Sequence, residues 1–307
     1  MTLHLQAKTE QGWIVDSPLQ PLVFPDGAVH IKGGDNPAVY AYQVAYAKGL
    51  SHDELFTLAM WAEACRERME KYVLILPYLP GARMDRGNPI GAQVYAWYIN
   101  DIVSPNQLIT IDPHSGVALQ FFKEDYLTVA AGGVPHKTTV FPVERIIRHE
   151  IQDPEQNEPQ VYQGVIAPDK GAHDRAAAAA KVMGNLPVYT AGKTRDFETG
   201  KLTGFHMEDE LPAEGRFLIV DDICDGGGTF NGLAEAIGIG KDRLDLWVTH
   251  GIFSKGLREL RKNFGVIHTT DSYYHEDHNG MAGGFPADPD FVKVHKLAKY
   301  LYGEIDL

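Results

Sequence analysis

The chain has 307 residues, enough for two ordinary domains, and its 44% apolar and 22% charged residues are typical of a globular protein. A formal net charge of −13 without a basic tract argues against a general nucleic-acid-binding protein, and two distant cysteines, Cys65 and Cys224, argue against a disulfide framework. Because the first residues lack a signal-peptide pattern and no apolar run approaches about 20 residues, we expect a cytoplasmic protein without a membrane segment.

Strand and helix patterns alternate along most of the chain, which predicts parallel sheets with right-handed crossovers. In the first half, strands are predicted at 38–46, 73–80 and 107–116, and helices at 52–72 and 89–102. In the second half, strands are predicted at 162–171, 186–192, 217–222, 243–253 and 266–272, and helices at 173–184, after residue 222 and at 289–303. The two halves of the chain show a weak similarity in their strand–turn–helix patterns, which predicts two related α/β domains, residues 1–140 and 141–307.

Residues 217–229, FLIVDDICDGGGT, place acidic residues, three glycines and a threonine after an apolar strand. Ligands of open parallel sheets bind beyond the carboxyl ends of the strands, where Asp221 and Asp222 are expected. Glycines permit close backbone approach, so that N–H groups can surround a phosphate, while Thr229 adds a hydroxyl and the following helix its N-terminal partial charge. The pattern favours a site for a phosphate and a ribose; the alternative is a tight turn with solvated aspartates.

The same stretch resembles the phosphoribosyl-pyrophosphate signature D-D-x-x-D-T-G-G-T of type I phosphoribosyltransferase folds. Other stretches resemble motifs of the ribose-phosphate pyrophosphokinases, in the order of that family. They are FPDG (24–27), LPYLPGARMDR (76–86), TIDPHSGVALQFF (110–122), APDKGAHDRA (167–176), KTR (193–195) and THGIFS (249–254). The resemblance covers most of the chain. It implies an α/β fold of two tandem phosphoribosyltransferase-like domains, each a mainly parallel sheet flanked by helices.

The resemblance implies an enzyme that transfers the diphosphoryl group of ATP to the anomeric hydroxyl of a ribose 5-phosphate moiety with Mg²⁺ and releases AMP. The implied catalytic residues are Lys193 and Arg195, and the implied metal-binding residues are His114 and Asp169. The implied ATP-binding residues are Phe24, Asp26, Arg83, Asp85, Arg86 and His114. The implied ribose-phosphate-binding residues are Asp221, Asp222, Asp225, Gly226, Gly227, Gly228 and Thr229.

By the same resemblance, Phe24 and Asp26 would contact the adenine bound by a neighbouring subunit, so a homo-oligomer, dimer or hexamer, is expected. Simpler interpretations exist for several of these residues. Lys193 and Arg195 lie in a polar, glycine-flanked segment that an exposed hairpin would also explain. A salt-bridged turn would explain the charged residues of 83–86, and a solvated loop would explain the histidine-rich stretch 268–279.

The sequence departs from the family's pattern at three places. The segment after Arg86 is much shorter and less basic than in the family, and Ala28 stands where the family has a glutamate. Gly226 replaces a threonine whose hydroxyl would help bind the 5′-phosphate. We expect this last change to weaken recognition of a free phosphate and to open space beside it. The hypothesis that follows is a 5′-substituted acceptor such as ADP-ribose, in nucleotide or NAD metabolism, with ribose 5-phosphate as the other candidate.

Two further functions stay open on the sequence. A phosphoribosyltransferase that consumes phosphoribosyl pyrophosphate would share the motif at 217–229 but would not need the motifs of the first half. A catalytically silent regulatory subunit would bind the same ligands without turnover. The short segment after Arg86 keeps this alternative open, whereas the presence of Lys193, Arg195, His114 and Asp169 argues against it.

Overall fold

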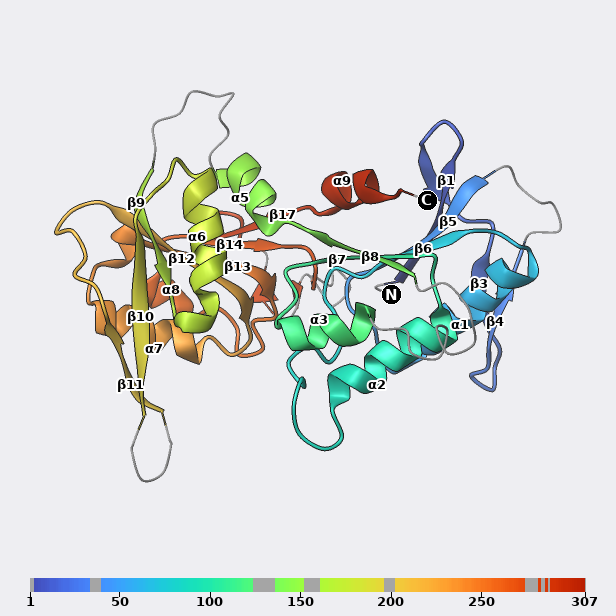
Figure 1. Cartoon of the computed structure of the whole chain (residues 1–307), viewed down its shortest axis with the longest axis horizontal. Coiled ribbons are helices and arrows are strands. Elements are labelled where there is room, and N and C mark those ends of the chain that lie inside the picture. The colour runs from blue at the N-terminus through green and yellow to red at the C-terminus, as the bar shows by residue number, and fades with distance from the viewer. Residues whose placement is uncertain are drawn as a thin grey trace. The chain divides into compact units, whose positions relative to one another are not determined.

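The structure, a computed structural model, describes residues 3–33, 40–123, 136–151, 161–195, 202–273, 281–282, 285–286 and 288–306 (Figure 1). It contains two compact units, which are described separately below. Unit 1 comprises Met1–Phe141 and Ala298–Leu307, and unit 2 comprises Pro142–Leu297. The chain from Ala298 onward therefore returns to unit 1, whereas the sequence prediction assigned it to the second domain.

Unit 1 is built on a six-stranded sheet in the order β2-β1-β5-β6-β7-β8. Its strands are β1 (Leu3–Thr9), β2 (Ile14–Asp16), β5 (Tyr40–Ala47), β6 (Tyr72–Ile75), β7 (Gln107–Ile111) and β8 (Lys137–Phe141). The last four run parallel to one another, and β1 pairs antiparallel with β5 and β2. A separate antiparallel hairpin is formed by β3 (Gln20–Val23) and β4 (Val29–Lys32). The sequence prediction had no strand before residue 38.

Four helices of unit 1 contribute to one core, in which Leu58, Trp61, Leu74 and Phe122 are fully enclosed. They are α1 (His52–Glu67), α2 (Gly91–Trp97), the π-helix Tyr98–Val103 and α3 (Gly116–Lys123); α9 (Ala298–Leu301) and the 3-10 turn Tyr302–Glu304 also belong to the unit. Ser51 caps α1 through a reciprocal capping box with Glu54, the third helical residue.

Unit 2 is built on a seven-stranded sheet in the order β11-β10-β9-β12-β13-β14-β17. Its strands are β9 (Tyr162–Ala167), β10 (Val188–Arg195), β11 (Leu202–Met207), β12 (Arg216–Cys224), β13 (Leu244–Gly251), β14 (Ile267–Thr270) and β17 (Val292–His295). All neighbouring pairs are parallel except β10 and β11. All eight residues of β13 are buried, as expected for a central strand covered on both faces.

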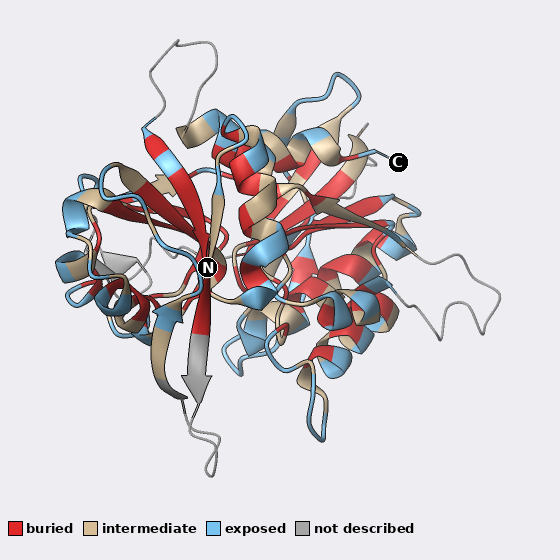
Figure 2. Cartoon of the chain, turned by 60° about the vertical axis from the view of Figure 1, so that its left-hand side comes forward, coloured by how far each residue is buried: buried red, intermediate tan, exposed pale blue. Residues whose placement is uncertain are grey.

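The helices of unit 2 are α5 (Val143–Ile151), α6 (His173–Val182), α7 (Gly228–Ile237) and α8 (Leu260–Asn263), with 3-10 turns at Lys170–Ala172 and Lys241–Arg243. Figure 2 shows the strands largely in the colour of buried residues, with the exposed residues on helix surfaces and loops. The remaining described strands, β15 (Met281–Ala282) and β16 (Phe285–Pro286), pair with each other. The predicted α/β fold with mainly parallel sheets and flanking helices is confirmed.

The predicted helix at 289–303 is wrong. Residues 292–295 form β17, which pairs with β14 at the sheet edge, and the short helix α9 and the 3-10 turn Tyr302–Glu304 follow it. Val292 and Val294 are β-branched residues that suit a strand, and the exposed edge of β14 supplies the backbone hydrogen bonds. No helix among the described ranges is both long and apolar enough to cross a membrane.

Candidate active site

The loop between β12 and α7 carries the acids and glycines that the sequence singled out. Gly227 precedes α7 with φ of +74°, and a Cβ atom at this position would lie 3.2 Å from the side chain of Leu260. Glycine is therefore required there by both backbone conformation and packing. No side chain caps the N-terminus of α7, so its first N–H groups are directed to the loop. These features make a backbone cradle suited to an anion.

The segment after β13 supports this loop from the side. The Ser254 hydroxyl donates to Asp225 Oδ1 at 2.5 Å, and the Ser254 N–H donates to the Asp225 carbonyl at 3.1 Å. The N–H groups of Ile252 and Phe253 both donate to the Cys224 carbonyl. The stretch THGIFS (249–254) thus holds the β12–α7 loop in place by hydrogen bonds. The sequence motif alone did not predict this contact.

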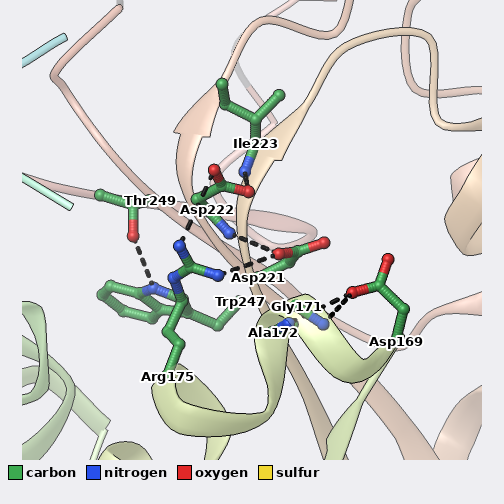
Figure 3. A network of polar contacts seen from close by, with 9 residues as sticks. All are labelled: Asp169, Gly171, Ala172, Arg175, Asp221, Asp222, Ile223, Trp247 and Thr249. Atoms are coloured by element: carbon green, nitrogen blue, oxygen red, sulfur yellow. Dashed lines mark hydrogen bonds and ion pairs between the residues drawn. The ribbon is translucent and has the colours of Figure 1, made fainter. Parts of the chain in front are cut away.

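Three charged side chains meet at the carboxyl end of β12 (Figure 3). Arg175 Nη1 lies 3.2 Å from Asp221 Oδ1, and Arg175 Nη2 lies 3.8 Å from Asp222 Oδ2. Asp221 Oδ1 also accepts from the Asp222 N–H at 2.9 Å, and Asp222 Oδ1 accepts from the Ile223 N–H at 2.8 Å. Side-chain exposure is only 14% for Arg175, 17% for Asp221 and 7% for Asp222. The contacts orient both carboxylates at the mouth of the cradle.

Arg175 was not among the predicted site residues. It lies on α6, one turn after the 3-10 turn at Lys170–Ala172, and reaches the neighbouring strand β12. Arg175 belongs to the quoted stretch APDKGAHDRA, but no local sequence pattern connects residue 175 with the aspartates at 221 and 222. The contact arises because β9 and β12 are adjacent in the sheet, so α6 lies next to the end of β12.

The two aspartates differ from free carboxylates because they lie close together and are largely shielded from water. Burial and the neighbouring charge of Asp222 raise the pKa of Asp221 to about 8, while Arg175 acts in the opposite direction. The half-buried Asp221 and the buried Asp222 thus both face the guanidinium of Arg175. A ligand that donates hydrogen bonds or positive charge would favour the ionised form of Asp221. Burial and the charges of Asp225 and Asp221 also raise the pKa of the Cys224 thiol to about 12, so it is neutral.

Asp169 lies at the carboxyl end of β9, the strand adjacent to β12 (Figure 3). Its Oδ1 accepts from the Gly171 N–H at 2.9 Å and from the Ala172 N–H at 3.2 Å, which caps the short 3-10 turn. His114, the other predicted metal-binding residue, follows β7 in unit 1. The predicted pair is therefore divided between the two units. Within the described ranges, no group of three or more His, Cys, Asp or Glu side chains could hold a metal ion.

The predicted ATP-binding residues Phe24 and Asp26 lie in the turn between β3 and β4. Asp26 Oδ1 accepts from the Ala28 N–H at 3.0 Å, and Gly27 has φ of +88°. Phe24 is 47% exposed although it is a large apolar side chain. The turn is closed by its own backbone hydrogen bonds between Phe24 and Ala28. It therefore presents an aromatic ring to its surroundings.

The charged segment after β6 contains the other predicted ATP-binding residues. Arg86 Nε lies 3.6 Å from Asp85 Oδ1, and the Arg86 side chain is 93% exposed. Arg83 precedes this pair in the same unit. The ion pair agrees with the simpler interpretation of a salt-bridged turn, and the exposure of Arg86 leaves its guanidinium open to an anion.

Lys193 and Arg195 lie in β10, where their backbones pair antiparallel with Phe205 and Leu202 of β11. This arrangement is the hairpin that the sequence left open as the simpler interpretation. Residues 196–201, between the two strands, lie outside the described residues. The catalytic assignment of Lys193 and Arg195 stays a prediction.

The histidine-rich stretch is not one solvated loop, because His268 belongs to strand β14. Its Nδ1 lies 3.1 Å from His295 Nε2, and both rings stack with the indole of Trp247. Burial and the neighbouring His295 lower the pKa of His268 to about 3, so the ring is neutral. Glu150 Oε2 lies 2.9 Å from His295 Nδ1. Residues 274–280 lie outside the described residues.

No family model matches the chain. Curated proteins named ribose-phosphate pyrophosphokinase are similar to it over most of its length. That of Thermococcus kodakarensis is 27% identical over 248 residues, which cover 77% of this chain and 78% of the relative. That of Saccharolobus solfataricus is 28% identical over 254 residues, 80% of each chain. That of Vibrio cholerae is 29% identical over 255 residues, 78% of this chain and 73% of the relative.

A solved structure has the same fold. The phosphoribosylpyrophosphate synthetase of Mycobacterium smegmatis matches with a TM-score of 0.69 over 94% of this chain and 89% of its own, at 15% identity. The chain shares the α/β fold of that synthetase, and the loop between β12 and α7 of unit 2 carries the acids and glycines of the predicted phosphate site. In sequence the chain is similar to proteins named ribose-phosphate pyrophosphokinase, which are transferases. The predicted resemblance and the predicted enzyme class are thereby confirmed.

Proposed function

We propose that the protein transfers the diphosphoryl group of ATP to the anomeric hydroxyl of a ribose 5-phosphate moiety and releases AMP. The observation that carries the proposal is the β12–α7 cradle with its two oriented carboxylates, in a chain similar to enzymes named ribose-phosphate pyrophosphokinase. The N–H groups of residues 226–229 would bind the 5′-phosphate. Asp221 and Asp222 would accept hydrogen bonds from the ribose hydroxyls, which holds the anomeric oxygen in place.

In the proposed reaction, the anomeric oxygen attacks the β-phosphorus of ATP. The bond between that phosphorus and the oxygen bridging it to the α-phosphorus breaks, AMP leaves with this oxygen, and the hydroxyl proton is released. Charge develops on the transferring oxygens, and cationic side chains lower the barrier by stabilising it. Lys193 and Arg195 are the cations we propose for this role, by the family resemblance.

The proposed ATP site comprises Arg83, Asp85, Arg86 and His114 of one subunit with Phe24 and Asp26 of a neighbouring subunit. The exposed ring of Phe24 suits stacking on adenine, and the exposed guanidinium of Arg86 suits a phosphate. This arrangement requires a homo-oligomer, at least a dimer and by the family resemblance up to a hexamer. Its size is measurable by light scattering of the purified protein.

Mg²⁺ is the cofactor we propose. Asp221 and Asp222 offer carboxylate oxygens, the ligands that a divalent cation prefers, and a bound cation would favour the ionised form of Asp221. Asp169, from the adjacent strand end, adds a carboxylate, and His114 is its proposed partner by resemblance. When bound, the ion would neutralise charge on the triphosphate oxygens.

The acceptor is proposed to be ribose 5-phosphate or a 5′-substituted form such as ADP-ribose. Gly226 lacks the threonine hydroxyl that would serve a free phosphate. Gly228 has open space, because a Cβ atom there would meet no described atom within 4 Å. A phosphate with a further substituent therefore has room at the entrance of α7.

The test is AMP release from ATP and Mg²⁺ with each acceptor, followed by mass analysis of the product. A product heavier than its acceptor by one diphosphoryl group supports the proposal and identifies the acceptor. Asp222→Asn should lower kcat/KM about 100-fold, the scale of a lost charged hydrogen bond, whereas exposed Asp242→Asn controls for removing a carboxylate from unit 2. Binding of both substrates without AMP would favour the silent regulatory subunit instead, and consumption of phosphoribosyl pyrophosphate would favour a phosphoribosyltransferase.

A further inference from the structure

The side chain of Lys255 lies against Gly226 in the cradle. A Cβ atom built on Gly226 would be 3.2 Å from Lys255 Cδ, 3.3 Å from Cε and 3.5 Å from Cγ. Three carbons of the lysine side chain, Cγ, Cδ and Cε, therefore lie against Gly226. The sequence predicted open space at Gly226, and the structure shows that these methylene groups border it.

The backbone of Gly226 does not itself demand glycine. Unlike Gly227, Gly226 is not among the residues with positive φ, so its conformation is open to other residues. A residue with a side chain at 226 would require the Lys255 stem to shift, because its Cβ atom would lie 3.2 Å from Lys255 Cδ. A threonine, which the family signature has here, would meet the lysine closer than most packed side chains do. Gly226 and Lys255 thus form one matched arrangement.

The ammonium group of Lys255 is available to a ligand. It makes no ion pair or hydrogen bond within the described part of the chain, and the residue is exposed. Its Nζ is one bond of about 1.5 Å beyond Cε, which places it within about 5 Å of a Cβ position on Gly226. At that range from the cradle, an unpaired cation attracts a phosphate that sits on the N–H groups of the loop.

We propose that Lys255 binds the 5′-phosphate group of the acceptor and takes over the role of the hydroxyl that Gly226 lacks. The charge of the lysine reinforces the backbone cradle, and its stem closes the side of the cradle that a residue with a side chain would otherwise fill. Lys255 is thus a binding and specificity residue of the site, and it acts before the transfer step. This inference rests on the proposed function, because it assumes a phosphorylated acceptor in the β12–α7 loop.

Lys255→Met tests the charge, because methionine keeps much of the stem over Gly226 and removes the ammonium. We expect the KM for ribose 5-phosphate and for ADP-ribose to rise about tenfold, with kcat and the KM for ATP within about twofold of wild type. The effect should shrink as salt is raised from about 0.05 to about 0.5 M, because salt screens an exposed charge. Lys181→Met, which removes an exposed charge from α6, is the matched control.

Gly226→Thr and the double variant Gly226→Thr/Lys255→Gly test the steric match. The single variant should bind acceptor more weakly than wild type because the two side chains compete for one space. The double variant should recover part of that loss. Its preference should also shift towards ribose 5-phosphate, so that the KM for ADP-ribose divided by the KM for ribose 5-phosphate should be larger than in wild type. Equal acceptor KM values for Lys255→Met and Lys181→Met, or independent effects of the two substitutions at 226 and 255, would overturn the inference.

Calorimetric titration of each acceptor into the protein without ATP separates this inference from the proposed function. If wild type binds an acceptor but releases no AMP, the proposed activity fails, and the affinity of Lys255→Met still decides the role of the lysine. If wild type turns over and Lys255→Met behaves as Lys181→Met, only the inference fails. If wild type binds neither acceptor, both fail.

Discussion

Asp221→Asn should stabilise the folded protein while it abolishes activity. The pKa of Asp221 is raised from 3.8 to about 8 by burial and by Asp222, so folding keeps a proton on a carboxyl group that is ionised in the unfolded chain. A shift of about four units at about 1.4 kcal/mol each corresponds to an upper limit of about 6 kcal/mol. Because the side chain keeps 17% exposure and water screens part of the charge, we expect about 2 kcal/mol.

The sign of the pH dependence follows from which state binds more protons. Below about pH 4 the carboxyl group is protonated in both states, and its contribution to stability is fully present. Between about pH 4 and pH 8 only the unfolded state ionises, so the wild-type free energy of unfolding falls as pH rises. The amide introduced by Asp221→Asn does not titrate, so the stability difference between the variant and wild type should be near zero at about pH 4 and largest near pH 8.

The assay is urea unfolding followed by circular dichroism at pH 4, 6, 7 and 8, with AMP release measured on the same samples. Asp174→Asn removes the same charge from a fully exposed side chain at the start of α6 and controls for charge removal itself. The reasoning about burial is refuted if the Asp221→Asn variant gains no stability over wild type between pH 4 and pH 8. A variant that keeps full activity would refute the proposed role of Asp221 at the ribose.

Three further substitutions test local parts of the fold. Gly227→Ala forces alanine to φ of +74° and against Leu260, so the free energy of unfolding in urea should fall by about 2 kcal/mol. Calorimetry should also show weaker binding of the acceptor. An unchanged midpoint of urea unfolding would contradict this prediction. Ser51→Ala removes the capping box with Glu54 and should cost about 1 kcal/mol in thermal unfolding without changing AMP release. Tyr162→Phe deprives a buried carboxylate on β13 of a 2.8 Å hydrogen bond and should cost about 1–2 kcal/mol in urea.

Local patterns were sufficient for most of the fold and for the cradle. Continuous apolar runs followed by polar turns gave the buried parallel strands, because a strand covered on both faces needs apolar residues at every position. The predicted helix at 52–72 corresponds to α1, because its amphipathic pattern is equally local. The acids and glycines of the cradle could also be identified from the sequence, since they follow one another within a single short stretch.

Contacts between distant segments were decided only by the tertiary structure. Residues 292–295 became a strand because the edge of β14 was open to pairing, although their sequence also suited a helix. Arg175 reached Asp221 through the adjacency of β9 and β12, and Lys255 came to lie on Gly226 through the turn after β13. The sequence by itself thus determined the alternation of elements and the acid- and glycine-rich loop proposed to bind an anion, because propensity and turn chemistry act within a few residues. The tertiary structure supplied the charges around that loop, because they come from segments that meet only when the sheet has assembled.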